Sequence, residues 1–103
     1  MQLSGADRRA LRALGNAVKP TVFVGKEGVT DAVLRAIDDG HRTEELLKVR
    51  VLDTCPLHRK DVASRIAAQS ASSMVQLLGR TILLFRAHPE EPKIVLPSAR
   101  PAR

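Results

Sequence analysis

The stretch Met74-Val75-Gln76-Leu77-Leu78-Gly79-Arg80-Thr81-Ile82-Leu83-Leu84-Phe85-Arg86 decides the fold of this 103-residue chain. Two apolar runs, 74–78 and 81–86, have the composition and length of β-strands. Gly79-Arg80 between them is a two-residue connection of the kind that joins antiparallel strands. We therefore predict a β-hairpin over residues 74–86, to which the rest of the chain must add its own strands.

Upstream of the hairpin, apolar periodicity predicts helices that alternate with strands. Ser4 and Asp7 have the spacing of a capping box before a first helix over 5–18, which ends before Pro20. Thr30 is an N-cap candidate for a second helix over 31–42, and a third helix is expected over 57–71. Strands are predicted over 21–24 and 46–52. The apolar face of the first helix is expected to be Leu11, Leu14 and Val18.

The resulting order of elements is α-β-α-β-α-β-β. Strands separated by helices favour parallel pairing, whereas the hairpin is antiparallel. The fold class expected is therefore α/β, a two-layer domain with a small mixed four-stranded sheet over residues 1–97. Residues 93–96 form a candidate edge strand, and residues 98–103 are expected to be a disordered basic tail.

Composition restricts the kinds of partner. The chain has 17 Lys and Arg against 11 Asp and Glu, a formal charge of +6 and a pI of about 10.5, which favours an anionic partner. The only aromatic residues of the Phe, Tyr and Trp type are Phe23 and Phe85. Since base stacking needs such side chains, an RNA would have to be held through its backbone and shape.

The same composition argues against several other classes. The single cysteine, Cys55, cannot form an internal disulfide, which is typical of a reducing cytosol. The longest apolar run is much shorter than the roughly 20 residues that span a membrane, and no signal peptide is visible. We therefore expect a soluble cytoplasmic protein without a cofactor, a small-molecule substrate or a membrane partner.

The loop Gly25-Lys26-Glu27-Gly28 is the strongest local signal for binding. It connects a predicted strand to a predicted helix, and its glycines allow close approach of the backbone to a ligand. Lys26 and the following helix N-terminus would attract a phosphate, as in the G-x-x-G loops that clamp nucleic-acid backbone. An ordinary turn with two glycines explains the same pattern. A nucleotide-binding P-loop is excluded, because it would need glycine at Pro20 and Ser or Thr at Glu27.

Unpaired positive charge extends this candidate site. The first helix is basic without internal partners, whereas pairs four residues apart, such as Asp38 with Arg42, would neutralise the second. Solvation of a helix face and protection of strand edges are the alternative explanations for such charges. The candidate RNA-contacting cations are Arg8, Arg12 and Lys19, followed in rank by Lys48, Arg50, Arg80 and Arg86.

Catalytic and metal-binding patterns are weak. Cys55 and His58 have C-x-x-H spacing, but no second pair completes a zinc site. His41 and His88 have no evident partners in the sequence. No isolated pair of carboxylates suggests acid–base chemistry, so we predict neither a catalytic residue nor a metal ligand.

Together these motifs resemble a CRM domain, the family named for chloroplast RNA splicing and ribosome maturation. The segments that carry the resemblance are Leu11 with Leu14, Lys19-Pro20, 24–30 (VGKEGVT), 45–51 (ELLKVRV), 75–86 (VQLLGRTILLFR) and 92–97 (PKIVLP), the last being similar to stand-alone bacterial members of the YhbY type. The resemblance covers residues 2–97. Phe85 departs from it, because many relatives have Tyr there.

The resemblance implies a fold similar to the C-terminal domain of translation initiation factor three, and it implies RNA binding. It associates bacterial members with large-subunit ribosomal precursors and plant members with intron splicing, and it maps the presumed RNA-contacting loop onto Gly25, Lys26, Glu27 and Gly28. The leading hypothesis is a non-catalytic RNA-binding protein that assists assembly of the large ribosomal subunit. The alternatives are a module that docks an acidic ribosomal or translation protein, and a DNA-binding protein.

Overall fold

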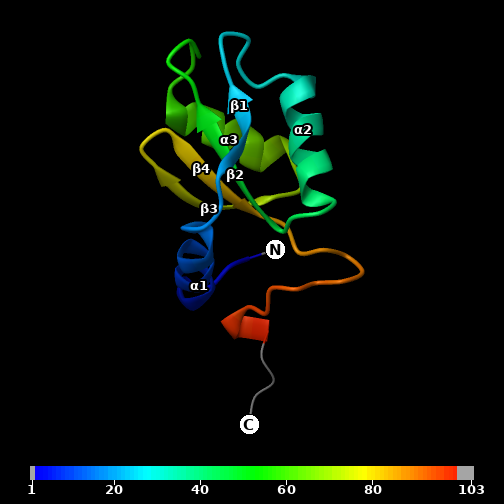
Figure 1. Cartoon of the computed structure of the whole chain (residues 1–103). Helices are drawn as coiled ribbons and strands as arrows, with labels where there is room; N and C mark the ends of the chain where they lie inside the picture. The colour runs from blue at the N-terminus through cyan, green and yellow to red at the C-terminus, as the bar shows by residue number, and fades with distance from the viewer. Residues whose placement is uncertain (1, 100–103) are drawn as a thin grey trace.

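The structure, a computed structural model, describes residues 2–99. Within that range the chain forms three α-helices, four β-strands and a short 3₁₀ turn. In chain order they are α1 (Gly5–Gly15), β1 (Pro20–Val24), α2 (Asp31–His41), β2 (Leu46–Val51), α3 (Arg59–Gln69), β3 (Ser73–Leu78), β4 (Thr81–Phe85) and η1 (Pro97–Ala99). This order confirms the predicted α/β class (Figure 1).

The four strands form one mixed sheet in the order β1-β2-β4-β3. β1 and β2 are parallel, while β4 pairs antiparallel with β2 and with β3. The β3–β4 connection is the predicted hairpin, and Gly79 at its first loop position has φ +58°, as a type II′ turn requires. The mixed four-stranded sheet is therefore confirmed.

Side chains of the central strand β4 alternate between two hydrophobic cores. Ile82 and Leu84 pack with residues of α2 and α3, among them Ile37 and Ile66, on one face of the sheet. Leu83 and Phe85 pack on the opposite face with Leu11 of α1 and Leu96 of the C-terminal segment. The expected two-layer arrangement thus acquires a partial third layer, because α1 lies on the face that α2 and α3 leave free (Figure 1).

The helix caps follow the sequence pattern closely. In the capping box of α1, the Asp7 amide donates to Ser4 Oγ and the Ser4 amide donates to Asp7 Oδ2, each with a donor–acceptor distance of 3.0 Å. Thr30 Oγ1 accepts from the Val33 amide at the start of α2.

The end and the buried face of α1 differ from the prediction. The helix ends at Gly15 rather than at Val18, with Asn16 as its C-cap. Gly15 lies close to β4, since a Cβ there would lie 2.7 Å from Leu83 Cδ2. The buried positions are Asp7, Leu11 and Gly15. Leu14 is 50% exposed, so its predicted place on the buried face is wrong.

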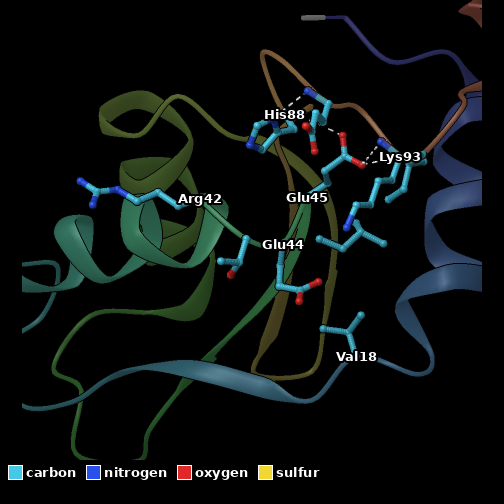
Figure 2. A pocket seen from close by; sticks show the side chains of 10 residues that line it. Val18, Arg42, Glu44, Glu45, His88 and Lys93 are labelled. Atoms are coloured by element: carbon cyan, nitrogen blue, oxygen red, sulfur yellow. Dashed lines mark hydrogen bonds between the residues drawn. The ribbon is translucent and has the colours of Figure 1, made fainter.

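After β4 the chain forms a C-terminal strap, residues 86–99, which runs back beside one end of the sheet to α1 (Figure 1). Residues 93–96 are not assigned to a strand, so the predicted edge strand is wrong. The physical reason is that a buried carboxylate, rather than a neighbouring strand, accepts from the amides of Lys93 and Ile94. Glu45 accepts hydrogen bonds from the amides of His88 (2.9 Å), Lys93 (2.9 Å) and Ile94 (2.8 Å) (Figure 2, dashed lines).

The far end of the strap is held by a second buried carboxylate. Asp7 accepts from the Ser98 amide (3.0 Å) and from the Ser98 hydroxyl (2.6 Å). Ser98 and Ala99, which the sequence assigns to the basic tail, therefore belong to η1 and contact α1. The rest of that expected tail lies outside the described residues. No helix of residues 2–99 combines the length and the apolar character needed to cross a membrane.

Glu45→Gln should destabilise the fold because an amide NH₂ would face backbone donors that now meet a carboxylate. We expect a loss of about 1–3 kcal/mol in the free energy of unfolding, measured by urea denaturation. Glu44→Gln is the matched control, since Glu44 is the exposed neighbour in the sequence. Equal stabilities of the two variants would show that Glu45 does not hold the strap.

Asp7→Asn should lower stability at neutral pH, and this deficit should shrink in acid. Hydrogen bonds from the Ser98 side chain and backbone lower the pKa of Asp7 from 3.8 to about 2. A lowered pKa stabilises the folded state above the unfolded value, and that contribution is lost as pH falls towards about 2. Urea midpoints of wild type and variant should therefore converge between about pH 4 and pH 2. A constant difference over that range would contradict this account.

Candidate nucleic-acid interface

The loop after β1 is a tight turn with its two charged residues at the tip. The Gly28 amide donates to the Gly25 carbonyl over 3.0 Å, and Lys26 and Glu27 between them are exposed. No hydrogen bond or ion pair engages the Lys26 side chain within residues 2–99. The loop therefore offers a cation and an exposed turn of backbone to a ligand.

The two glycines of this turn have different physical roles. Gly28 has φ +72°, a left-handed conformation in which any Cβ is strained. The φ of Gly25 is not positive, and a Cβ there would lie 3.5 Å from Thr54 Oγ1, an ordinary contact distance. The turn itself therefore requires glycine at position 28. It does not require glycine at position 25, where the absence of a side chain would instead let a ligand approach the backbone.

Three connections meet at the end of the sheet where β1 and β2 finish, and we call this region the loop edge. It consists of residues 25–28, residues 52–60, which include the first two residues of α3, and the hairpin turn 79–80 (Figure 1). The Leu52 amide donates to the Val24 carbonyl, and the Val51 amide donates to the Arg80 carbonyl. Ligands of open α/β sheets commonly bind beyond the carboxyl ends of parallel strands, which is the position of this edge.

The structure adds two cations to the loop edge that the sequence analysis missed. Arg59 and Lys60 are the first residues of α3, are exposed, and lack an ion pair within the described range. Positive charge in the first turn of a helix opposes the helix dipole, so their position costs some stability. That unfavourable placement is the signal from which they could have been found.

Three of the predicted RNA-contacting cations are engaged in internal contacts. Arg8 Nη1 donates to the carbonyls of Met74 (2.8 Å) and Val75 (3.2 Å), which ties α1 to β3. Arg80 at the hairpin turn pairs with Asp53. Arg86 lies at the opposite end of β4, where it pairs with Asp38 over 2.6 Å and donates to the Ala71 carbonyl.

The remaining predicted cations are free of such contacts in the part of the chain that the structure describes. Lys19 is exposed in the connection between α1 and β1. Arg12 and Lys48 line a common hollow between α1 and the sheet. Arg50 is exposed on β2, on the same side of the strand as Lys48. The structure thus brings Arg12, Lys48 and Arg50 onto one face, next to the loop edge.

The larger group of acidic residues lies at the other end of the molecule, while Glu27, Asp31, Asp53 and Asp61 lie in or beside the loop edge. Six of the chain's 11 acidic residues lie near the start of β2 and the strap, namely Asp38, Asp39, Glu44, Glu45, Glu90 and Glu91. Figure 2 shows the pocket of about 490 Å³ at this end, into which Glu45 projects. Because that carboxylate already accepts three backbone hydrogen bonds, we assign it to the strap rather than to a ligand.

The second helix does not neutralise itself in the predicted way. Asp38 pairs with Arg86 of another element, and Arg42 pairs with Asp39 three residues away over 3.7 Å, so the expected Asp38–Arg42 pair is wrong. Asp38 instead serves to connect α2 to the end of β4.

The histidines and the cysteine have structural contacts. Cys55 packs against the α2–α3 core, and His58 Nδ1 caps α3 by accepting from the Lys60 amide. His41 donates to the Glu44 carbonyl and contacts Ser72 Oγ at 2.8 Å, and His88 accepts from the amides of Glu90 and Glu91, so both have partners that the sequence did not reveal. Burial lowers the pKa of His41, which favours its neutral form. Residues 2–99 contain no cluster of three metal-ligating side chains.

Gly28→Ala should destabilise the fold by about 1–2 kcal/mol, because it forces a Cβ into the left-handed region. Gly25→Ala is the matched control and should melt close to wild type, since its Cβ meets only ordinary contacts. Thermal unfolding of both variants checks this difference. If Gly28→Ala were as stable as wild type, the turn would not need its positive φ.

Comparisons with known proteins agree with the architecture described above. "Probable RNA-binding protein YqeI" of Bacillus subtilis is 37% identical over 95 residues, covering 92% of this chain and 99% of that protein. A protein of Haemophilus influenzae named "RNA-binding protein" is 30% identical over 95 residues, covering 92% and 95% respectively. The solution structure of the hypothetical protein SAV1595 from Staphylococcus aureus is 32% identical, with a TM-score of 0.78 over 93% of this chain and all of that one.

The family model of the CRS1 / YhbY (CRM) domain matches residues 3–86, which contain all three helices and all four strands described here. The match includes the turn 25–28 and the hairpin, two of the segments on which the resemblance in sequence rests. This chain therefore belongs to the CRS1/YhbY (CRM) domain family.

Proposed function

We propose that this chain is a non-catalytic RNA-binding protein, and that it binds ribosomal RNA in large-subunit precursors and assists their assembly in the cytoplasm. The observation that carries the proposal is the gathering of unpaired cations from distant parts of the sequence at one end of the sheet. Lys26, Arg59 and Lys60 belong to the loop edge, and Arg12, Lys48 and Arg50 lie on the adjoining face.

The chemistry of these residues suits the phosphate backbone. Lys and Arg neutralise phosphates and release counterions, which supplies most of the affinity for nucleic acid without reading sequence. Helices α2 and α3 both begin at the loop edge, and the dipole of each helix adds partial positive charge at its N-terminus. The acidic residues at the opposite end would repel a polyanion, so the molecule should bind with the loop edge towards RNA.

Family membership supports the same proposal. Two relatives of nearly the same length as this chain carry the name RNA-binding protein. The cations engaged inside the fold, Arg8 and Arg86, have a smaller part in the proposed contact than the sequence analysis assigned to them. Gly25, Lys26, Glu27 and Gly28 remain the proposed centre of the contact.

Lys26→Gln should weaken binding to large-subunit precursor RNA and reduce its salt dependence. Loss of one phosphate contact lowers the slope of log affinity against log salt by about 0.7–0.9. Arg42→Gln is the matched control, because it removes the same charge from an exposed residue at the acidic end. Titrations of both variants and wild type over a range of salt measure the slopes.

Several results would contradict this proposal. A slope near zero for wild type would show that phosphates are not bound. Equal slopes for the two variants would remove Lys26 from the interface. Nuclease treatment of precursor particles should release the bound chain, and persistence of the complex after treatment would favour docking to an acidic protein instead.

A further inference from the structure

One part of the sheet is covered neither by α1 nor by the strap, and we call it the open sheet face. Strand register defines it: Phe23 of β1 is level with Arg50 of β2, Arg50 with Thr81 of β4, and Thr81 with Leu78 of β3. Val22, Val24, Val49 and Val51 point into the α2–α3 core, so the residues between them point to the other side. Phe23, Arg50, Thr81 and Leu78 therefore form a row across the sheet, next to the loop edge.

Phe23 is the unusual member of this row. The other phenylalanine, Phe85, is 1% exposed, whereas Phe23 is 51% exposed. Burial of a large apolar side chain is favourable, so a partner that covered the exposed part of this ring would gain binding free energy. Leu78 at the other end of the row is 69% exposed and is separated from Phe23 by Arg50 and Thr81, so Phe23 is the apolar group beside the cations.

The charge around the ring identifies the kind of partner. Arg50 is the direct neighbour of Phe23, and Lys48 lies two residues earlier on the same side of β2. Arg12 of α1 completes the group, and none of the three side chains has an ion pair among residues 2–99. The side chains that form this face include no carboxylate, so its chemistry suits an anion that also carries a flat apolar group.

A hollow beside the row provides polar contacts. It has a volume of about 160 Å³ and lies between the end of α1 and strands β2, β4 and β3. Asn16, Lys48, Gln76 and Thr81 are among its lining residues. Amide and hydroxyl groups of this kind can hydrogen-bond the edges of an unpaired base.

We propose that the open sheet face binds single-stranded RNA, with an unpaired base stacked on the Phe23 ring and adjoining phosphates held by Arg50 and Lys48. The inference rests on the proposed function and adds the class of RNA and the way it is read. A base inside a duplex is stacked on its neighbours and cannot lie on the ring, so the RNA must be unpaired there. The sequence, with its two aromatic residues, led us to expect that the chain contacts only the backbone and shape of an RNA. That expectation is too restrictive, because one exposed ring suffices to stack one base.

Phe23→Trp tests the stacking directly, because the chain contains no Trp or Tyr and the new indole is the sole strong fluorophore. Addition of a short single-stranded oligouridine should quench its fluorescence, and a duplex RNA of equal length should not. Val95→Trp is the control, since Val95 is 64% exposed on the strap, and its fluorescence should stay unchanged. Unquenched fluorescence of the Phe23→Trp variant, once saturated with RNA, would overturn the proposal.

Affinities supply the second test. Phe23→Ala and Phe23→Leu should each weaken binding of the oligouridine by about 5-fold to 150-fold, the loss measured for one stacked base. Phe23→Leu retains an apolar side chain, so a melting curve like that of wild type separates lost stacking from misfolding. Affinity for the duplex should be unchanged in both variants.

The outcomes separate this inference from the proposed function. If Phe23→Ala binds oligouridine like wild type while Lys26→Gln binds RNA more weakly, the stacking proposal is overturned and the proposed function stands. If wild type binds neither oligouridine nor large-subunit precursor RNA, both are overturned. If Phe23→Ala instead converts a dimer to a monomer in sedimentation without a loss of RNA affinity, the face pairs two copies of the chain and the stacking proposal is again overturned.

Discussion

The structure depends on one constraint, which is that the central strand β4 must bury both of its faces. Ile82 and Leu84 require cover on one side, and Leu83 and Phe85 require it on the other. Each such side chain contributes about 1.5–3 kcal/mol when it is removed from water. The helices α2 and α3 cover the first side and form the larger of the two cores with it. The second side is left to α1 and to the strap, which together cover only part of it.

Two buried carboxylates determine how far that second cover extends. Glu45 binds the strap at three amides near the start of β2, and Asp7 binds it again at Ser98 beside α1. Burial raises the pKa of Glu45, but the three amide donors outweigh burial, so its pKa lies below its ordinary value. The strap is therefore confined to the acidic end of the molecule. The opposite end, where the loop edge and the open sheet face meet, is left uncovered and positively charged.

Local patterns predicted the elements well, because capping and alternation depend on neighbouring residues. The capping box at Ser4, the N-cap at Thr30 and the hairpin at Gly79 are all present in the structure. Contacts between distant residues were not predictable in this way. The engagement of Arg8 and Arg86 depends on partners 66 and 48 positions away, and the strap depends on amides 43 to 49 positions from Glu45. Periodicity likewise could not show that Leu14 and Phe23 are exposed, because each fits an apolar pattern in its own segment.

The central claim is that RNA binds at the uncovered, positively charged end of the sheet. Amide chemical-shift changes during titration with large-subunit precursor RNA fragments test it most directly, since the amide signals of all described segments are followed in the same experiment. We predict changes concentrated in residues 23–28, in 48–60 and around the hairpin turn, with little change at the strap residues 88–94. Changes centred on the strap and the start of β2, or an even spread over the whole molecule, would contradict it.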